Sequence, residues 1–409
     1  MELCELENNG WRQDFPMLSQ TMHQKPLIYL DSGASALKPQ PVINAITNFY
    51  QQAYSSVHRG VYQLSANATL TFESVRIKVQ EFINAASPEE IIFTSGTTES
   101  INLVAYGFSQ LGLTAQDNII ISQMEHHANF VPWQILCQKT GAELRIIKLN
   151  DNGDLDLDHF QQLLSSKTRL VAVTHVSNVI GTVNPIHKIV NLAHRLNVPV
   201  LVDGAQAVPH LPVNIRDLDC DFYVFSAHKL YGPTGVGVLY GKTNWLNRLP
   251  PYKTGGNMIR RVCLTETEFQ DIPNKFEAGT PNVAGVIGFG AALNYIQQIG
   301  IENISSHEKK LVSFTHEMLA DIPEITVLAH PAERIGVFSL NTFPLHPHDL
   351  GTFLDHQGIA VRVGHHCAMP LIEHFKVPAT MRLSLGMYND QREIEIFCKS
   401  LKEAIAFFR

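Results

Sequence analysis

The sequence is poor in charge and has no surplus of basic residues. Charged residues make up 17% of the 409 residues, and the formal net charge is −7. A protein with a net negative charge has no general field that attracts nucleic acid or an anionic membrane surface. We therefore expect no nucleic-acid partner and no membrane partner.

Long apolar segments are missing as well. No apolar run approaches the roughly 20 residues that a transmembrane helix requires. The opening segment, MELCELENNGW, is acidic and lacks the basic stretch and apolar core that are typical of a secretory signal. Together these features predict a cytoplasmic protein.

Cysteines are few and scattered, and no two of them form a CxxC pair. This spacing argues against a zinc ribbon and against a disulfide framework, so we expect reduced thiols and no metal site. The six cysteines are Cys4, Cys137, Cys220, Cys263, Cys367 and Cys398.

From Leu27 onward, short apolar runs alternate with amphipathic stretches such as PIHKIVNLAHRL. Short, continuously apolar runs are typical of strands that are buried on both faces. Their alternation with helical patterns predicts an α/β fold with a mostly parallel, mixed sheet and helices on both faces. The expected strands are residues 90–94, 118–122, 144–149, 170–175, 198–203, 221–226 and 236–240.

The length suits two domains. After about Gly300, helical stretches alternate with two more expected strands, residues 335–341 and 359–363, and a final helix is expected over residues 390–408. We therefore divide the chain into a large α/β domain, residues 27–300, and a smaller α/β domain. The smaller domain combines residues 1–26 and 301–409.

Polar clusters follow five of the expected strands directly. In open parallel sheets, ligands bind beyond the carboxyl ends of the strands. One Asp or Ser at a strand end is more often a turn or a helix cap than a ligand contact, but five clusters together favour a single pocket. They are SGTTES, MEHHAN, the VSN after LVAVTH, the DGAQ after VPVLV, and SAHK.

Lys229, in SAHKLYGPTG, is the strongest candidate for chemistry. It follows a buried strand, where desolvation lowers the pKa of an amine and makes it a nucleophile for carbonyl groups. An ordinary surface lysine is the alternative. Asp203 favours the functional reading, because a buried carboxylate needs a cationic partner and a protonated pyridine nitrogen is one. A pyridoxal phosphate site requires such an aspartate and such a lysine.

The segment SGTTES opens an expected helix, and the free N–H groups at a helix start bind anions. Gly96 allows a close approach of the backbone, while Thr97 and Thr98 offer hydroxyls. An ordinary helix cap is the alternative. Ser226 and His228, beside the lysine, offer further donors for a phosphate group.

Two more residues have a functional and an ordinary interpretation. His126, in MEHHAN, either stacks on a cofactor ring or is an ordinary loop histidine with its hydrogen bonds made within the protein. The EHH string lacks the spacing of a helical HExxH metal motif. Cys367 follows a glycine and two histidines, which indicates a loop and not a core strand, although free cysteines are usually buried and inert. Metal binding by His365, His366 and Cys367 ranks well below a nucleophilic role, because adjacent residues rarely converge on one ion.

At this point the motifs identify a family. The chain resembles the group II cysteine desulfurases, the SufS/CsdA-type enzymes, from Leu30 to Asn389. The pairing of SAHKLYGPTG with a downstream GHHCA is highly specific. The matching segments are LDSGASALKP, VHRG, SGTTESINLVA, EHHANFVPW, HVSN, VDGAQA, DFYVFSAHKLYGPTGVGVLYG, KFEAGTPNVAGVIGFGAAL, VRVGHHCAMP and RLSLGMYN.

The resemblance implies the fold-type I architecture of pyridoxal-phosphate enzymes, a homodimer, and a role for each matching residue. Lys229 would hold the cofactor covalently, and Cys367 would accept the sulfur. The cofactor would further be held by Thr97, Thr98, His126, Asp203, Gln206, Ser226 and His228, joined by Thr280 of the other subunit. Asn178, Arg362 and Arg382 would bind the substrate, with Arg382 as a bidentate clamp on its carboxylate.

The implied reaction converts L-cysteine to L-alanine and leaves sulfur as a persulfide on Cys367. Thiolate is the nucleophile in such a step, and Arg362, His365 and His366 offer positive potential for it. Selenocysteine and cysteine sulfinate are further substrates that the resemblance suggests. The implied sulfur acceptor is a SufE- or CsdE-like protein or an iron–sulfur assembly scaffold.

Two alternatives stay open on the residues alone. One is a kynureninase-like or aminotransferase-like enzyme of the same fold, in which Cys367 is incidental. The other is a non-catalytic protein that has kept the fold. Two positions depart from many relatives: Met369 stands where many carry Gln, and Ser95 where close relatives often have Arg.

Overall fold

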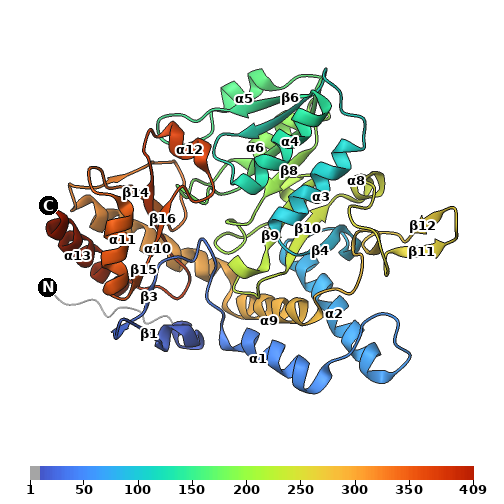
Figure 1. Cartoon of the computed structure of the whole chain (residues 1–409), viewed down its shortest axis with the longest axis horizontal. Helices are drawn as coiled ribbons and strands as arrows, with labels where there is room; N and C mark the ends of the chain where they lie inside the picture. Colours follow the sequence, from blue (N-terminus) through green and yellow to red (C-terminus); the bar gives the residue numbers. More distant parts are fainter. Residues whose placement is uncertain (1–9) are drawn as a thin grey trace.

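The structure is a computed structural model, and it describes residues 10–409. The acidic opening segment and Cys4 lie outside the described residues. Within them, a large seven-stranded sheet and a smaller four-stranded sheet lie side by side (Figure 1). The α/β prediction is therefore confirmed. No helix of residues 10–409 is long and apolar enough to cross a membrane.

All seven strands expected in the first part of the chain lie in the large sheet, in the order β4-β10-β9-β8-β7-β5-β6. Strand β10 is antiparallel to both of its neighbours, and the remaining strands run parallel to one another. The strand bounds differ from the expected ones by up to two residues. They are β4 Ile91–Thr94, β5 Asn118–Ser122, β6 Glu143–Ile147, β7 Thr168–Thr174, β8 Val200–Asp203, β9 Phe222–Ser226 and β10 Gly237–Gly241.

Helices cover both faces of the large sheet because successive strand residues point to opposite sides. Ile91 and Phe93 belong to one hydrophobic cluster and Ile92 to another. The first cluster includes residues of α1 (Gln40–Asn48), α2 (Gln63–Phe82), α5 (Leu157–Leu163), α6 (Ile186–His194), α7 (Ile215–Leu218) and α9 (Val283–Ile299). The second includes residues of α3 (Thr97–Ser109), α4 (Val131–Thr140) and α8 (Thr243–Arg248).

The small sheet has the order β13-β14-β17-β16 and a hydrophobic cluster of its own. Gly300 adopts a φ of 87° between α9 and the following helix, a left-handed conformation that glycine tolerates best. The elements are β13 Thr326–Val327, β14 Val337–Asn341, β16 Arg362–Gly364, β17 Thr380–Ser384, α10 Ile301–Ala320, α11 Pro347–His356, α12 Met369–His374 and α13 Gln391–Phe408.

One expected strand was wrong as a single element. Residues 359–363 form two strands, β15 (Ile359–Ala360) and β16, which belong to different sheets. Strand β15 pairs in parallel with β3 (Ile28–Tyr29), whereas β16 pairs antiparallel with β17. The chain therefore changes sheets within a few residues, which an apolar pattern does not reveal. The division into domains stays a prediction, and β3 joins the N-terminal part of the chain to β15 in a two-stranded sheet.

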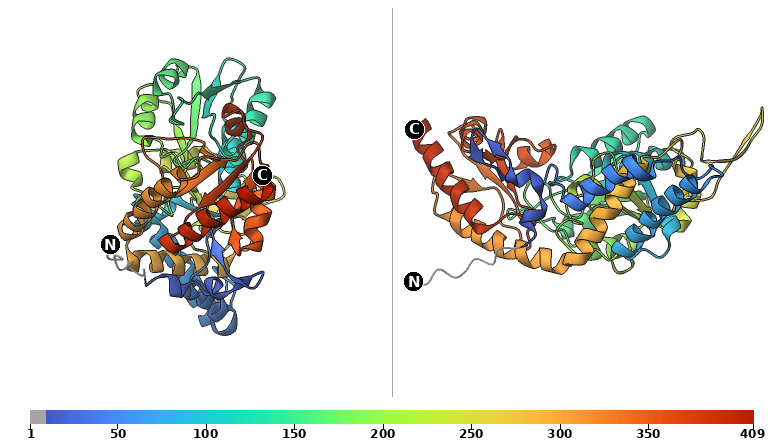
Figure 2. Two further views of the ribbon diagram at one scale, coloured as in Figure 1. Left: turned by 90° about the vertical axis from the view of Figure 1, so that its left-hand side faces the viewer. Right: turned by 90° about the horizontal axis from the view of Figure 1, so that it is seen from below.

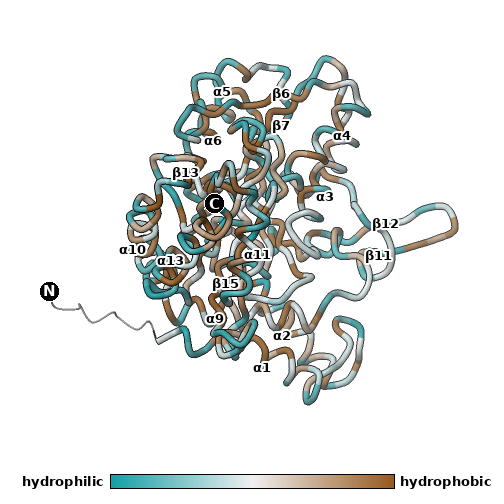
Figure 3. Tube along the Cα trace, turned by 60° about the vertical axis from the view of Figure 1, so that its left-hand side comes forward, coloured by the Kyte–Doolittle hydropathy of each residue, from teal (hydrophilic) through white to brown (hydrophobic). Residues whose placement is uncertain are grey.

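A hairpin extends from the body of the molecule (Figures 1 and 2). It consists of β11 (Ile259–Val262) and β12 (Thr267–Phe269). Its tip is hydrophobic (Figure 3), and Leu264 and Val262 there are 106% and 56% exposed. The other short hairpin pairs β1 (Thr21–Met22) with β2 (Lys25–Pro26).

A buried ion pair joins α2 to the segment before α9. Arg76 Nη1 lies 2.7 Å from Glu277 Oε1, and both side chains are almost fully buried. The second oxygen of Glu277 accepts a bond of 3.0 Å from Arg76 Nη2, and the backbone N–H of Phe93 donates to Glu277 Oε1. Burying a charge is costly unless it is paired, so each partner depends on the other.

We predict that Arg76→Ala strongly destabilises the protein, because it leaves the Glu277 carboxylate buried without its partner. The expected cost is about 3–5 kcal/mol of unfolding free energy. Thermal and denaturant unfolding measure it. Arg260→Ala, which removes exposed pairs with Glu268 and Asp271, is the control and should leave the midpoints unchanged. Equal midpoints for both variants would contradict the prediction.

Candidate active site

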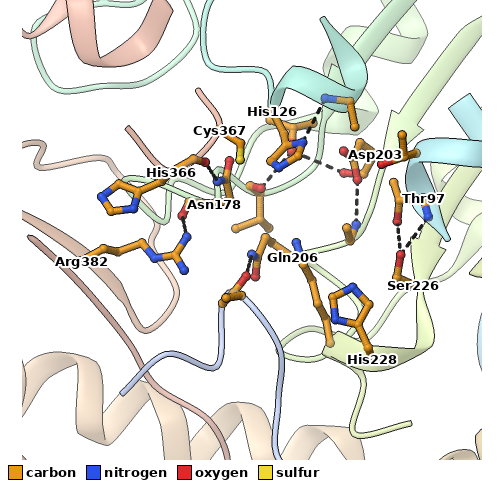
Figure 4. A pocket seen from close by; sticks show the side chains of 18 of the residues that line it. Thr97, His126, Asn178, Asp203, Gln206, Ser226, His228, His366, Cys367 and Arg382 are labelled. Carbon is orange, nitrogen blue, oxygen red and sulfur yellow. Dashed lines mark hydrogen bonds between the residues drawn. The ribbon is translucent and has the colours of Figure 1, made fainter. Parts of the chain in front are cut away.

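A pocket of about 230 Å³ lies at the carboxyl ends of the large-sheet strands, and loops of the smaller sheet close it (Figure 4). Every residue expected to bind the cofactor or the substrate or to accept sulfur lines it, except Thr280. The larger sheet contributes Thr97, Thr98, His126, Asn178, Asp203, Gln206, Ser226, His228 and Lys229, and the smaller one contributes Arg362, Cys367 and Arg382. Polar clusters at five strand ends thus share one site.

Thr280 lies elsewhere. It is exposed and lines a separate cavity together with Ser95, Glu99 and Lys253. The expectation that it reaches the pocket of another subunit is compatible with this position and stays a prediction.

Lys229 ends the short helical turn Ala227–Lys229 that follows β9. The pKa of its amine is lowered to about 8, mainly by burial; Asp203 opposes this shift, and the nearby guanidinium of Arg382 adds to it. A much larger fraction of the amine is therefore uncharged near neutral pH than in an ordinary lysine, as a nucleophilic or basic role requires.

Asp203 closes β8 on the strand beside β9 and is 5% exposed. Burial raises the pKa of its carboxyl, while a hydrogen bond of 3.0 Å from the N–H of Ala205 and the charge of Lys229 favour the ionised form. A buried carboxylate with one neutral donor is suited to a cationic ligand atom.

Gln206 lies one turn beyond Asp203 and is 3% exposed. Its Nε2 donates to the carbonyl of Gly33 at 2.6 Å, whereas its buried Oε1 has no hydrogen-bond partner. An unsatisfied buried carbonyl oxygen costs free energy. Gln206 Oε1 is therefore available to accept a hydrogen bond from a polar group of a bound ligand.

The opening of α3 forms a concave anion cradle. The N–H of Thr97 donates to Ser226 Oγ at 2.8 Å, and the hydroxyls of the two residues are 2.7 Å apart. Gly237 has to be glycine, because a Cβ there would lie 2.4 Å from the backbone of Gly96. With Thr98 beside them, these groups give a helix N-terminus and several hydroxyls, which suit a phosphate group.

Two histidines border the pocket in their neutral form. Burial, aided by the charge of Lys229, lowers the pKa of His126 to about 3 and that of His228 to about 4. His126 Nδ1 accepts a hydrogen bond of 3.0 Å from the N–H of Ala128. Since Nδ1 is the acceptor, the ring proton of His126 lies on Nε2.

Two arginines share one carboxylate at the edge of the pocket. Arg382, which is 2% exposed, donates from Nη2 to Asp31 Oδ1 at 3.0 Å and from Nη1 to the carbonyl of Asn178 at 2.9 Å. Arg362 binds Asp31 through Nε and Nη2. One negative charge between two positive ones leaves a net positive region, which suits the carboxylate of a small substrate.

Cys367 is exposed and lines the same pocket as Lys229. It lies in a turn in which both His366 and Cys367 have a positive φ, 53° and 58°. Non-glycine residues rarely adopt this conformation, so surrounding contacts have to impose it.

Three hydrogen bonds impose the turn. The N–H of His127 donates to the carbonyl of Cys367 at 2.7 Å, and Asn178 Nδ2 donates to the carbonyl of His366 at 2.7 Å. The N–H of Met369 donates to His127 Nε2 at 3.1 Å. This last bond needs a neutral imidazole, and burial, followed by the charge of His365, lowers the pKa of His127.

Sequence reasoning gave no role to Asp31, Glu125 or His127. Glu125 is fully buried, and burial raises the pKa of its carboxyl to about 8. It accepts hydrogen bonds from Ser122, Asn129 and the N–H of Thr174, and so joins the ends of β5 and β7. Only their places in the sequence could have indicated these residues: Asp31 is the second residue of LDSGASALKP, and Glu125 and His127 flank His126.

Comparisons with known proteins agree with this geometry. Residues 28–397 match the family model described as aminotransferase class-V. A cysteine desulfurase of Escherichia coli (strain K12 / DH10B) is 53% identical over 385 residues, covering 94% of this chain and 95% of that protein.

Solved structures are similar over nearly the whole chain. The S-sulfonic acid form of the cysteine desulfurase CsdA from Escherichia coli matches with a TM-score of 0.90 and 37% identity, covering 97% of this chain and 98% of that one. C-DES, solved as a lysine-to-alanine mutant with glycine covalently linked to the PLP cofactor, matches with a TM-score of 0.82 and 26% identity over 95% and 98% of the two chains.

We predict that His127→Ala loosens the Cys367 turn, because the N–H of Met369 loses its acceptor. Loss of one hydrogen bond of about 1 kcal/mol corresponds to roughly a fivefold rise in local opening. Hydrogen exchange of the 366–370 segment measures this. His374→Ala, a change in α12 away from the turn, is the control, and equal exchange in the two variants would refute the assignment.

Proposed function

The chain belongs to the aminotransferase class-V family and is a pyridoxal-phosphate-dependent group II cysteine desulfurase, and on this premise we propose that it stores the sulfur of L-cysteine as a persulfide on Cys367. The carbon product of the proposed reaction is L-alanine. The observation that carries the proposal is one pocket lined by an amine with a lowered pKa, a buried carboxylate, two arginines and an exposed thiol.

The residues of the pocket fit the cofactor. The orphaned Oε1 of Gln206 and the buried carboxylate of Asp203 suit polar atoms on the rim of a pyridine ring, and the cradle at α3 suits a phosphate. Lys229 would hold the aldehyde carbon, Asp203 the ring nitrogen and Gln206 the ring oxygen, with His126 over the ring. Thr97, Thr98, Ser226 and His228 would hold the phosphate, together with the partner subunit's Thr280.

When bound, pyridoxal phosphate withdraws electrons from Cα of the attached amino acid and so loosens the bonds around that carbon. Asp203 would keep the ring nitrogen protonated. Lys229 Nζ, largely desolvated and with a pKa of about 8, would accept the Cα proton and return it at a neighbouring carbon. The neutral ring of His126 would face the ring of the cofactor with its proton on Nε2.

The two arginines would bind the substrate carboxylate. Arg382 has one buried nitrogen, Nε, without a hydrogen-bond partner, and its position is fixed by Asp31 and Asn178. Arg362 is held by the same Asp31 and lies closer to solvent. A carboxylate held here leaves the amino acid side chain free to reach Cys367, which lines the same cavity.

The Cys367 thiolate would attack the substrate sulfur. An S–S bond forms, the Cβ–S bond breaks, and its electron pair stays with the carbon fragment, which takes up protons to become L-alanine. The enzyme keeps the sulfur as a persulfide. No outside oxidant is needed, because sulfur is oxidised as the carbon is reduced.

A persulfide requires a second thiol to collect it, and a SufE- or CsdE-like protein or an iron–sulfur scaffold is the proposed acceptor. Selenocysteine and cysteine sulfinate are proposed as further substrates.

The cytoplasm is the proposed location. Cysteines 137, 220, 263, 367 and 398 are free, which agrees with a reducing compartment.

A homodimer is proposed as the working form. Thr280 is exposed and lies away from its own pocket. Exposed apolar side chains support the proposal: the rings of Tyr50 and Tyr54 stack 5.8 Å apart beside Val61 and Tyr62, which are 102% and 52% exposed. Exposed apolar patches often mark interfaces.

We expect mass spectrometry after L-cysteine treatment without reductant to find one added sulfur on Cys367. Cys367→Ser should keep the cofactor absorbance but carry no sulfur, and its alanine production should fall on the order of 100-fold or more, because the nucleophile is lost. Cys263→Ser is the matched control and should behave as wild type. Full activity of Cys367→Ser with cysteine and reductant would exclude the persulfide role and favour another activity of the fold.

The rate at which cofactor-free protein captures pyridoxal phosphate should rise with pH. The uncharged amine is the reactive form, and the pKa of Lys229 is lowered to about 8, so the rate should rise through that pH and then level. Asp203→Asn should move the midpoint to lower pH, since Asp203 stabilises the charged amine. Stopped-flow absorbance measures the rate. A rate that still rises near pH 10 would show an ordinary lysine.

A further inference from the structure

Three potential metal ligands lie together outside the active site: His23, Asp355 and His356. His23 Nε2 is 2.8 Å from Asp355 Oδ2, and the rings of His23 and His356 are 4.6 Å apart. One ligand atom from each residue lies within 4.8 Å of the others. Among residues 10–409 no other such group was found. Since His23 and Asp355 are 332 positions apart, no sequence motif announces the group.

The fold holds these side chains in place from two elements. His23 and Gln24 form the two-residue turn between β1 and β2, with φ of 51° and 64°. Such turns are usually Asn-Gly, so this histidine is not the residue that the backbone prefers. Asp355 and His356 are the last two residues of α11. A bond between Lys25 and Gln357 fastens the hairpin to the same end of the helix.

We propose that His23, Asp355 and His356 bind a divalent transition-metal ion such as Zn²⁺, Ni²⁺ or Cu²⁺. Two imidazoles and one carboxylate are the donors that these ions accept, whereas Mg²⁺ and Ca²⁺ require oxygen ligands. Bonds of about 2.0–2.2 Å to one ion place two ligand atoms at most about 4.4 Å apart, so binding would draw these side chains slightly closer together. Three protein ligands leave the remaining positions to water.

The site would act as a clip between the N-terminal hairpin and α11. Strands β3 and β15 begin a few residues beyond it and run in parallel, Ile28 beside Ile359. They lead to Asp31 and Arg362, which are paired at the edge of the active site. A metal ion would thus fix one end of a short ladder whose other end carries Asp31 and Arg362.

A second exposed pair provides a matched control. His187 Nε2 lies 2.9 Å from Asp217 Oδ2, and the side chains are 50% and 67% exposed, compared with 43% and 49% for His23 and Asp355. The His187 pair belongs to no three-ligand group among the described residues. A comparison of variants of the two pairs therefore distinguishes a metal site from an ordinary exposed histidine–aspartate hydrogen bond.

Calorimetric titration of tag-free holoenzyme with Ni²⁺ tests the proposal. Nickel favours imidazole over thiolate, and a Cys367→Ser background removes the exposed active-site thiol. We expect one Ni²⁺ per chain. His23→Asn, His356→Asn and Asp355→Asn should each weaken binding roughly tenfold or more, since loss of even an outer-shell partner of a metal costs 10- to 100-fold. His187→Asn should leave the binding curve unchanged.

Asparagine tolerates the left-handed turn, so His23→Asn should fold, and circular dichroism checks this. The proposal is overturned if the His23→Asn and His356→Asn curves coincide with that of the parent protein. It is equally overturned if His187→Asn weakens binding as much as they do, because binding would then be non-specific.

Discussion

The active site depends on burying an amine and a carboxylate at the ends of two neighbouring strands. Desolvation disfavours the charged form of both groups, while their mutual attraction restores it in part. The pKa of Lys229 therefore falls to about 8, and that of Asp203 rises. A surface lysine would stay protonated, and an isolated buried aspartate would be neutral. The parallel sheet makes the arrangement possible because β8 and β9 end side by side.

A second shared charge organises the opposite side of the pocket. Asp31 holds Arg362 and Arg382 together, and Asn178 connects Arg382 with the Cys367 turn. The two arginines and the Cys367 turn are thus connected through a few side chains. Glu125, whose pKa is raised to about 8 by burial, connects the ends of β5 and β7 next to His126 in the chain.

The sequence predicted the α/β fold, all seven strands of the large sheet and the residues that gather in one pocket. The strands and most of the pocket residues follow from local patterns, which are short apolar runs buried on both faces and polar clusters at their ends. Arg362 and Arg382 were placed in the site only by the resemblance to a known family. What the sequence did not predict depends on distant contacts. Residues 359–363 divide between two sheets because β3, far away in the chain, pairs with β15. The role of Asp31 and the group around His23 are invisible for the same reason. The individual roles of the pocket residues are proposals that the geometry supports.

The pairing of Asp31 with its arginines has a consequence for biosynthesis. Asp31 is 331 positions from Arg362 and 351 from Arg382. During synthesis the strands of the large sheet and Lys229 are made well before either arginine, so this part of the chain can fold first. The two pairs of Asp31 form only after β16 and β17 have been made. A chain that ends before these strands would carry the buried amine of Lys229 but neither of the arginines that border its pocket.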